Sequence, residues 1–302
     1  MSRRDITAVP HRDGRFVEVA DRCWVARHDF FDVNVGVIGG RDGLLVVDTH
    51  ASEELARDVV ARVRALGAGE VVAVVNTHAH FDHVLGNAVF GEEYAGAATW
   101  AHEAAAAALP RTAETARQEA GRDPRGEDDP RFAGIAASRV RVPERTFSSA
   151  RVIDLGDRLV ELLHPGRGHT DGDAIVRVPD VDVVYAGDLV EESAERQAVP
   201  GFGDDCFPLE WPFTLDLVIS MLSDATLVVP GHGAPVDRDF VSEQRGSIGM
   251  VAEQVRELAG GGVPVAEALA AGSWPYPAEQ LEQAVRRGYS QLPRQARSLP
   301  LA

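Results

Sequence analysis

The chain begins with short apolar runs that have the length of β-strands. They cover residues 16–26, 33–38 and 44–47, and Gly39, Gly40 and Gly43 lie between the last two runs. Apolar runs separated by a short glycine-rich stretch are typical of strands joined in a hairpin. We therefore expect strands at the start of the chain, the last two joined by a tight turn.

A helix is expected next, over residues 52–66. Ser52 can cap its first turn, and Leu55, Val59, Val63 and Leu66 recur at the spacing of a single helix face. Gly67 suits the position just after the last turn. The wholly apolar run 71–75 follows, and it predicts a strand that is buried on both faces.

The second half of the chain predicts further strands and then helices. Strand patterns lie at residues 149–154, 158–163, 174–178 and 183–186, a helix is expected at 214–222, and a strand at 227–229. Residues 110–146 are rich in charged residues, glycine and proline, and apart from a helical stretch at 114–120 we interpret them as an insertion or lid. Residues 239–302 predict two or three helices. The fold class is therefore α/β, with one domain over residues 1–302 and a C-terminal helical extension.

Charge and cysteine content narrow the range of partners. The 302 residues include 30 basic and 47 acidic side chains, which gives a formal charge of −17. An acidic surface repels phosphate backbones and anionic lipid headgroups, so we expect a small-molecule substrate, no nucleic acid and no membrane. Cys23 and Cys206 form no CxxC motif, and the N-terminus lacks the apolar region of a signal peptide. A cytoplasmic protein is expected.

Candidate chemistry is concentrated directly after the apolar run 71–75. The segment NTHAHFDH contains His78, His80, Asp82 and His83 within six residues. Packing alone gives no reason to crowd these side chains, whereas imidazoles and a carboxylate are good ligands for zinc and other divalent metals. The segment therefore predicts metal binding at the end of a buried strand.

Three later segments each place a candidate ligand beside glycine. They are GHTDGD with His169, GD with Asp188 and GHG with His232. Glycine lets the backbone turn sharply and approach a crowded centre. With the first segment they supply enough ligands for two adjacent metals with open positions for water.

The ordered set HAHFDH, GHTDGD, AGDLV and PGHG, with Asp48 in VVDTH upstream, resembles the metallo-β-lactamase superfamily over roughly residues 16–236. The resemblance implies that one metal is held by His78, His80 and His169, that the second is held by Asp82, His83 and His232, and that Asp188 bridges them. Asp48 and Thr170 are expected behind the ligands, where they would hold them in place.

The resemblance also implies a fold and a mechanism. The family fold is an αββα sandwich of two similar halves. Two divalent ions, with zinc as the first choice and iron or manganese as alternatives, would lower the pKa of a shared water and give a hydroxide nucleophile. Asp82 is expected to orient the nucleophile and to move a proton.

Several branches of the superfamily are candidates for the activity of this chain. Glyoxalase II enzymes share the ligand set, but the C-terminal helices here lack convincing basic residues for glutathione carboxylates. The main alternative is a persulfide dioxygenase, in which His78, His169 and Asp188 would hold a single iron. β-Lactamases with the HxHxDH pattern usually lack an aspartate where Asp188 stands, so β-lactamase activity is a second alternative. The complete set of second-site ligands favours the dinuclear hydrolase.

The expected substrate is a small or medium-sized ester, thioester, lactone or amide. Phe202, Phe207 and Trp211 lie in a long loop between the last predicted strands. We expect them to form an apolar wall of the substrate pocket, with residues 110–146 closing over it.

Overall fold

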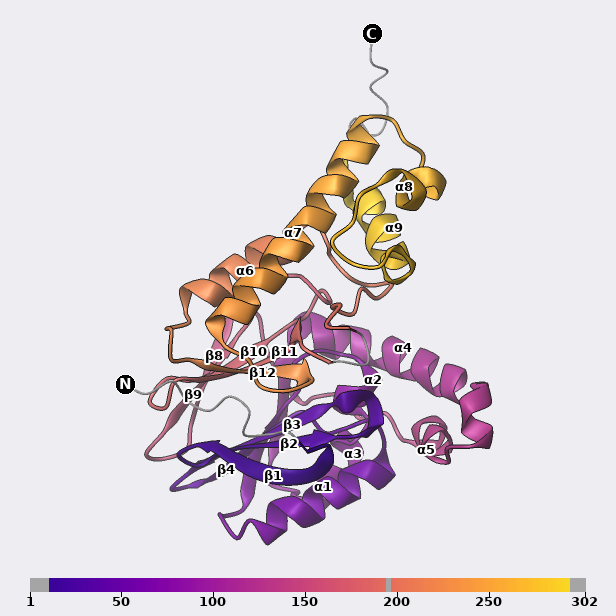
Figure 1. The fold of residues 1–302 in the computed structure, drawn as a ribbon. Helices are drawn as coiled ribbons and strands as arrows, with labels where there is room; N and C mark the ends of the chain where they lie inside the picture. The colour runs from indigo at the N-terminus through magenta and orange to yellow at the C-terminus, as the bar shows by residue number, and fades with distance from the viewer. Residues whose placement is uncertain (1–10, 194–196, 294–302) are drawn as a thin grey trace.

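The computed structural model describes residues 11–193 and 197–293, and its strands form two sheets that pack face to face (Figure 1). The first sheet has seven strands, in the order β1 (Asp13–Ala20), β2 (Cys23–His28), β3 (Asn34–Gly40), β4 (Gly43–Val47), β5 (Val71–Val75), β6 (Ala98–His102) and β7 (Arg145–Phe147). Neighbouring strands are antiparallel from β1 to β4 and parallel from β4 to β7.

The second sheet has five strands. Their order is β12 (Leu227–His232), β11 (Val183–Glu191), β10 (Ile175–Val178), β9 (Leu159–Leu163) and β8 (Ala150–Asp154). Strands β8 to β11 are antiparallel to their neighbours, while β11 and β12 run parallel. The carboxyl ends of β11 and β12 therefore lie at the same edge of the sheet.

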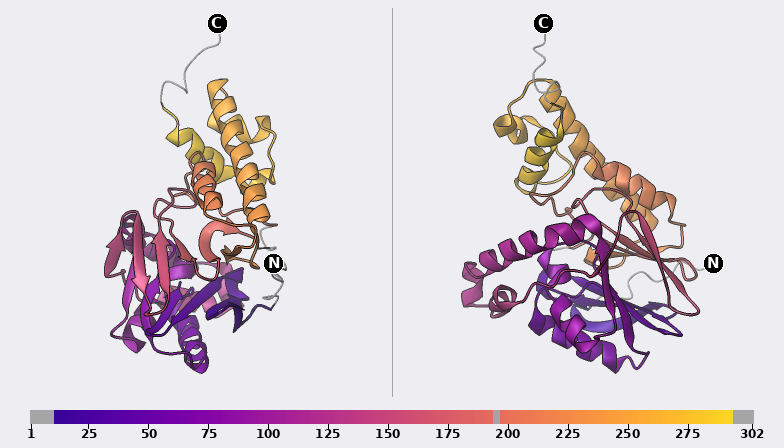
Figure 2. Two further views of the ribbon diagram at one scale, coloured as in Figure 1. Left: turned by 90° about the vertical axis from the view of Figure 1, so that its left-hand side faces the viewer. Right: turned by 180° about the vertical axis from the view of Figure 1, so that it is seen from behind.

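Helices cover the outer face of each sheet. The α-helices of the described residues are α1 (Glu53–Ala65), α2 (Phe81–Val84), α3 (Asn87–Glu93), α4 (Glu103–Ala120), α5 (Arg131–Ala137), α6 (Trp211–Ser220), α7 (Arg238–Gly260), α8 (Val265–Ala271) and α9 (Glu282–Gln291). Residues of α1 and α3 share a core cluster with the first sheet, and residues of α6 and α7 share another with the second. The layers are therefore αββα, as the views from the side and from behind also show (Figure 2).

Apolar burial explains why these segments became strands. In β4 and β11 every residue is buried, because one face of the strand meets the other sheet and the opposite face meets helices. Between the sheets, Ile38 and Leu45 belong to the same buried cluster as Leu162 and Val176. Helix α1 begins as predicted, with the Leu55 amide donating to Ser52 Oγ.

Two sequence-based boundaries were wrong. The run 16–26 is a hairpin of two strands, because Arg22 has a left-handed backbone (φ 51°) that reverses the chain between β1 and β2. Helix α4 runs from Glu103 through Pro110 to Ala120, whereas within the segment 110–146 the helical stretch was predicted to start only at residue 114. Pro110 is exposed, and the buried alanines and Leu109 on the opposite side pack against α5, so tertiary packing outweighs the cost of proline in the helix.

The C-terminal helices form an extension beyond the sandwich. Helix α7 starts on the second sheet and continues past it, and α8 and α9 pack against its far end (Figure 1). None of the helices in residues 11–193 and 197–293 has the length and apolar character that crossing a bilayer requires.

Candidate metal centre

The fold brings the predicted ligands to one end of the two sheets. His78 follows β5, His80 is the residue before α2, and α2 contains Asp82 and His83. The second sheet contributes from three places: His169 lies in the loop before β10, Asp188 lies within β11, and His232 ends β12.

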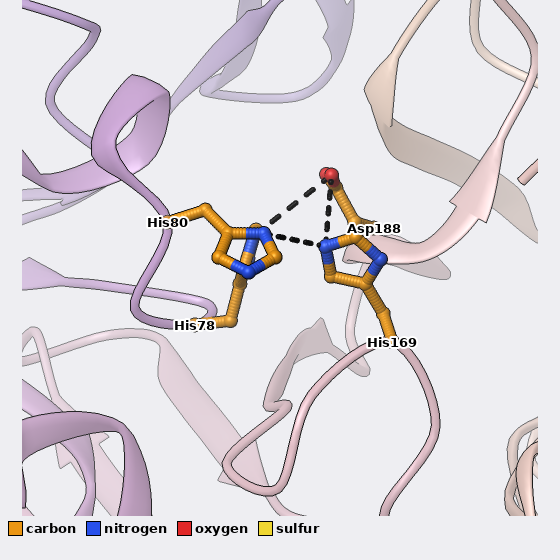
Figure 3. A group of neighbouring side chains, drawn as sticks. All are labelled: His78, His80, His169 and Asp188. Atoms are coloured by element: carbon orange, nitrogen blue, oxygen red, sulfur yellow. Dashed lines mark hydrogen bonds and ion pairs between the residues drawn. The ribbon is translucent and has the colours of Figure 1, made fainter. Parts of the chain in front are cut away.

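Four of these residues form the first ligand group. His78, His80, His169 and Asp188 each offer one atom, and these atoms lie within 4.8 Å of one another (Figure 3). The Nδ1 atom of His80 is 2.8 Å from Nε2 of His169, which is 3.4 Å from Oδ2 of Asp188. Nε2 of His78 lies 3.8 Å from the same carboxylate oxygen. The four side chains therefore surround one point.

Asp82, His83 and His232 form the second group, again with ligand atoms within 4.8 Å of one another. Nε2 of His232 is 3.3 Å from Nε2 of His83 and 3.3 Å from Oδ2 of Asp82. Asp188 reaches this group as well, because its Oδ2 is 3.1 Å from Nε2 of His232 and its Oδ1 is 3.2 Å from Nε2 of His83. Its carboxylate thus lies between the two groups.

The outward-facing nitrogen of each histidine contacts an oxygen atom. The pairs are His78 Nδ1 with Thr77 Oγ1 (3.1 Å), His80 Nε2 with Asp205 Oδ2 (3.0 Å), His83 Nδ1 with Asp48 Oδ2 (2.9 Å), His169 Nδ1 with Gly201 O (2.8 Å) and His232 Nδ1 with Phe31 O (2.7 Å). Carbonyl and carboxylate oxygens can only accept, so in the last four pairs the outer ring nitrogen must carry the hydrogen. The inner nitrogen of each neutral ring then presents a lone pair to the centre.

These lone pairs face one another, which indicates that the centre is built for cations. The inner nitrogens of His80 and His169, and those of His83 and His232, meet at the short distances given above. Within the described part of the chain, the buried atoms Nε2 of His78 and Oδ1 of Asp188 have no hydrogen-bond partner. Facing lone pairs repel unless a positive charge lies between them, and nitrogen and carboxylate donors suit divalent first-row metals. The residues therefore fit two such ions.

The protonation behaviour of the centre supports the same conclusion. Burial alone would lower the pKa of His232, but the carboxylates of Asp188 and Asp82 raise it to about 9. Burial likewise opposes ionisation of Asp188, yet the surrounding histidines, His232 and His83 foremost, hold its pKa well below the ordinary value. Burial, followed by the charge of His83, keeps the pKa of His78 well below its ordinary value. The carboxylates thus favour positive charge at the centre, and the buried histidine rings cannot all provide it by taking up a proton.

The two predicted supporting residues have different surroundings. Asp48 accepts hydrogen bonds from the Thr77 amide and hydroxyl, both at 2.8 Å, and lies against His83, so it joins the end of β5 to a ligand. Thr170 instead donates to the Asp173 carboxylate through its amide (3.0 Å) and hydroxyl (2.6 Å). It therefore shapes the turn that follows His169.

Sequence reasoning missed Asp205 and the carbonyl groups of Phe31 and Gly201. Asp205 lies in the long loop between β11 and α6, and its side chain is 23% exposed beside His80. Burial opposes its ionisation, but the hydrogen bond and charge of His80 lower its pKa to about 2. The only sequence signal is the pair Asp204-Asp205 in that loop, and nothing in its spacing connects it to His80.

A cavity of about 630 Å³ opens onto the centre. Five ligands line it, namely His80, Asp82, His169, Asp188 and His232. Phe31, Phe81 and Phe202 provide apolar lining, and α4 adds a polar stretch from Arg111 to Glu119. The loop residues 199–205 and, from the C-terminal extension, Gln280 and Gln283 also line it.

The three aromatic residues predicted for the pocket occupy three different environments. Phe202 lines the main cavity, and Phe207 lines an adjoining recess of about 330 Å³. Trp211 is completely buried behind Phe202, with 5.3 Å between ring centroids, and its Nε1 donates to the Leu189 carbonyl. The expectation for Trp211 is thereby corrected: it is a core residue, because no part of its side chain is left to face a substrate.

Similarity to known proteins covers the same part of the chain. Residues 28–232 match the sequence model of the family described as metallo-beta-lactamase superfamily. Two curated relatives, both named metallo-beta-lactamase type 2, come from Bacillus cereus and from Bacillus sp. (strain 170). Each is 26% identical over 205 residues, which are 68% of this chain and 68% of the relative.

Solved structures with the same fold include the metallo-beta-lactamases from Pontibacter korlensis and Hirschia baltica. The first has a TM-score of 0.59 and the second 0.58, each at 18% identity and over 78% of this chain, with 98% and 97% of the respective structures covered. The family match spans every residue of both ligand groups. The chain therefore belongs to the metallo-β-lactamase superfamily, as a hydrolase of that fold with a dinuclear-type His/Asp site.

Proposed function

We propose that the protein hydrolyses a small or medium-sized ester, thioester, lactone or amide with two divalent metal ions, zinc foremost. The observation that carries this proposal is the arrangement of two ligand groups around Asp188 at the floor of an open cavity. When bound, the two ions would supply a water of lowered pKa as nucleophile and would polarise the scissile carbonyl group.

Asp82 is the residue to which we assign proton transfer. Its carboxylate belongs to the second ligand group and also lines the cavity, so it can contact both a ligand site and a substrate. A carboxylate in that position can orient a water molecule, accept its proton and pass the proton to the leaving group. Asp188 also lines the cavity, but its place between the two groups suits it to bridge them.

The cavity walls support a substrate with one apolar and one polar part. Phe31 and Phe81 meet edge to face with 5.2 Å between ring centroids, and with Phe202 they exclude water from one part of the lining. Arg111 of α4 provides hydrogen-bond donors elsewhere in the same cavity, whereas the Thr112 hydroxyl already donates to the Ala79 carbonyl at 2.9 Å. An acyl chain against the phenylalanines and a polar group near α4 would fit this lining.

The test substrates should include a β-lactam. It is a cyclic amide and so falls within the proposed class, and both curated relatives are named as β-lactamases. The aspartate at position 188 is the feature of this chain that argues for a broader search, because it resembles the bridging carboxylate of other branches of the superfamily.

Metal content and a substrate panel test the proposal together. Elemental analysis of protein purified anaerobically without chelators should give two zinc or manganese ions per chain. Chromogenic esters, thioesters, lactones, amides and a cephalosporin should then reveal at least one hydrolysed class. The variants Asp82→Ala and Asp188→Ala should lose that activity while far-ultraviolet circular dichroism stays unchanged. A single iron with oxygen uptake on glutathione persulfide, or cleavage of phosphodiesters alone, would refute the proposal.

A further inference from the structure

A short turn between β2 and β3 has an unusual backbone. Phe31 and Asp32, two consecutive residues other than glycine, have φ angles of 60° and 56°. This left-handed region is rarely adopted by residues other than glycine, so a turn of this kind persists only where its surroundings hold it. The turn therefore needs a specific set of contacts.

The Asp32 side chain provides those contacts from inside the protein. It is completely buried and accepts hydrogen bonds from Nε (2.6 Å) and Nη2 (2.9 Å) of Arg27. The Arg27 side chain is itself only 8% exposed. Ser193 Oγ donates to the same carboxylate at 3.0 Å, and Nε of Arg12 lies 3.3 Å away. A bidentate arginine pair of this kind fixes both the position and the orientation of the carboxylate.

The backbone of the same turn holds His232 from two sides. The Phe31 carbonyl accepts from His232 Nδ1 at 2.7 Å, and the Asp32 carbonyl accepts from the Gly233 amide at 3.0 Å. Val33 pairs with His232 as an isolated bridge. Asn34 then donates from Nδ2 to the carbonyls of Pro230 (2.9 Å) and Gly233 (2.7 Å). Both the ring of His232 and the chain around it are therefore fixed by residues 31–34.

We propose that the buried Arg27–Asp32 ion pair positions His232 and thereby sets the affinity of the second metal site. Neither Arg27 nor Asp32 belongs to a ligand group, so the pair acts through the turn. The ion pair keeps the left-handed turn in place, the turn directs the Phe31 carbonyl at the imidazole, and that contact fixes which nitrogen faces the metal. Loss of the pair should weaken the group of Asp82, His83 and His232, and spare the group of His78, His80 and His169.

The inference rests on the proposed two-metal site and is tested with the full chain. The main variants are Asp32→Asn, which keeps the shape of the side chain, and the double variant R27M/D32N, which leaves no unpaired charge buried. Titration with Zn²⁺ against a competing chelator resolves the two affinities. We expect one zinc affinity, that of the group with His232, to fall ten- to a hundredfold, while the other changes less than about twofold. Nitrogen-15 spectra of the labelled histidine rings should show that His232 loses its preference for a hydrogen on Nδ1.

Arg158→Met is a matched control. Its side chain is fully buried, pairs with Asp21 and Asp180, and donates to the Gly39 carbonyl in the first sheet, away from both ligand groups. This variant should lower the unfolding midpoint and leave both zinc affinities unchanged. If the double variant does not fold, Arg27→Lys keeps the charge but loses the bidentate contact, and it should give an intermediate loss at the same single site.

The outcomes separate the two proposals. A wild-type chain that binds a single metal would refute the proposed function. Two metals in the wild type, with both affinities unchanged or equally reduced in the folded Arg27 and Asp32 variants, would refute the positioning role alone.

Discussion

Replacement of Asp205 tests how the first ligand group is held. The Asp205 carboxylate lies 3.0 Å and 3.3 Å, through its two oxygens, from Nε2 of His80. Hydrogen bonds to charged groups contribute about 1.5–3 kcal/mol. Because both side chains are 23% exposed, water can replace part of the lost contact, and we expect the lower end of that range. Asp205→Asn, which keeps an oxygen acceptor but removes the charge, should therefore weaken the first metal site about tenfold.

The assay is a zinc titration against a competing chelator, followed by metal analysis after dialysis. Asp204→Asn is the control, because it removes the same charge from the adjacent exposed residue, which also lines the cavity. It should leave both zinc affinities unchanged. The reasoning fails if Asp205→Asn keeps wild-type affinity, or if the two aspartate variants weaken zinc binding to the same extent.

Three further predictions follow from the geometry of the site. A methyl group added at Gly231 would overlap Oδ1 of Asp188, so Gly231→Ala should lose metal and activity, whereas Gly246→Ala, which meets open space, should lose neither. The pKa of His232 is raised to about 9 from an ordinary 6.5, so protonation of this ring stabilises the metal-free fold. The stabilisation is complete below pH 6.5 and is lost as the pH rises through about 9. The melting temperature of the metal-free protein should therefore fall between pH 6.5 and 9 while that of the zinc-loaded protein falls less; a rise in the metal-free protein over this window would contradict the assignment. Finally, Arg111 lines both the cavity and the adjoining recess. Arg111→Gln should therefore raise KM about fivefold for substrates that carry a carboxylate and leave KM unchanged for neutral substrates of the same size. Equal effects on both kinds of substrate would rule out a charge contact.

The parts of the fold and site that the sequence predicted are those encoded by neighbouring residues. The helix from Glu53 has its cap, its apolar face and its terminal glycine within a single stretch, so local chemistry defines it. The segment from His78 to His83 likewise contains four candidate metal ligands within six residues, directly after a buried strand. In both cases the interactions that determine the local structure or chemistry are between residues close together in the sequence.

The parts that the sequence did not predict depend on contacts between distant segments. Asp205 meets His80 only because the loop before α6 folds back over the end of β5. The Arg27–Asp32 pair matters because its turn meets the end of β12, which comes some two hundred residues later. Pro110 remains inside α4 because α5 packs against the opposite side of that helix. The spacing of residues along the chain does not predict such contacts between distant segments.

Both ligand groups draw on each half of the sandwich. His78 and His80 follow the first sheet while His169 and Asp188 belong to the second, and Asp82 and His83 similarly combine with His232. Bound ions would therefore act as cross-links between the halves, and neither half could assemble a complete site by itself. Since a site that forms only on folding contributes its binding free energy to the folded state, a chelator should lower the melting temperature of this protein. The supply of metal, as much as the packing between the sheets, would then set how long a folded chain survives.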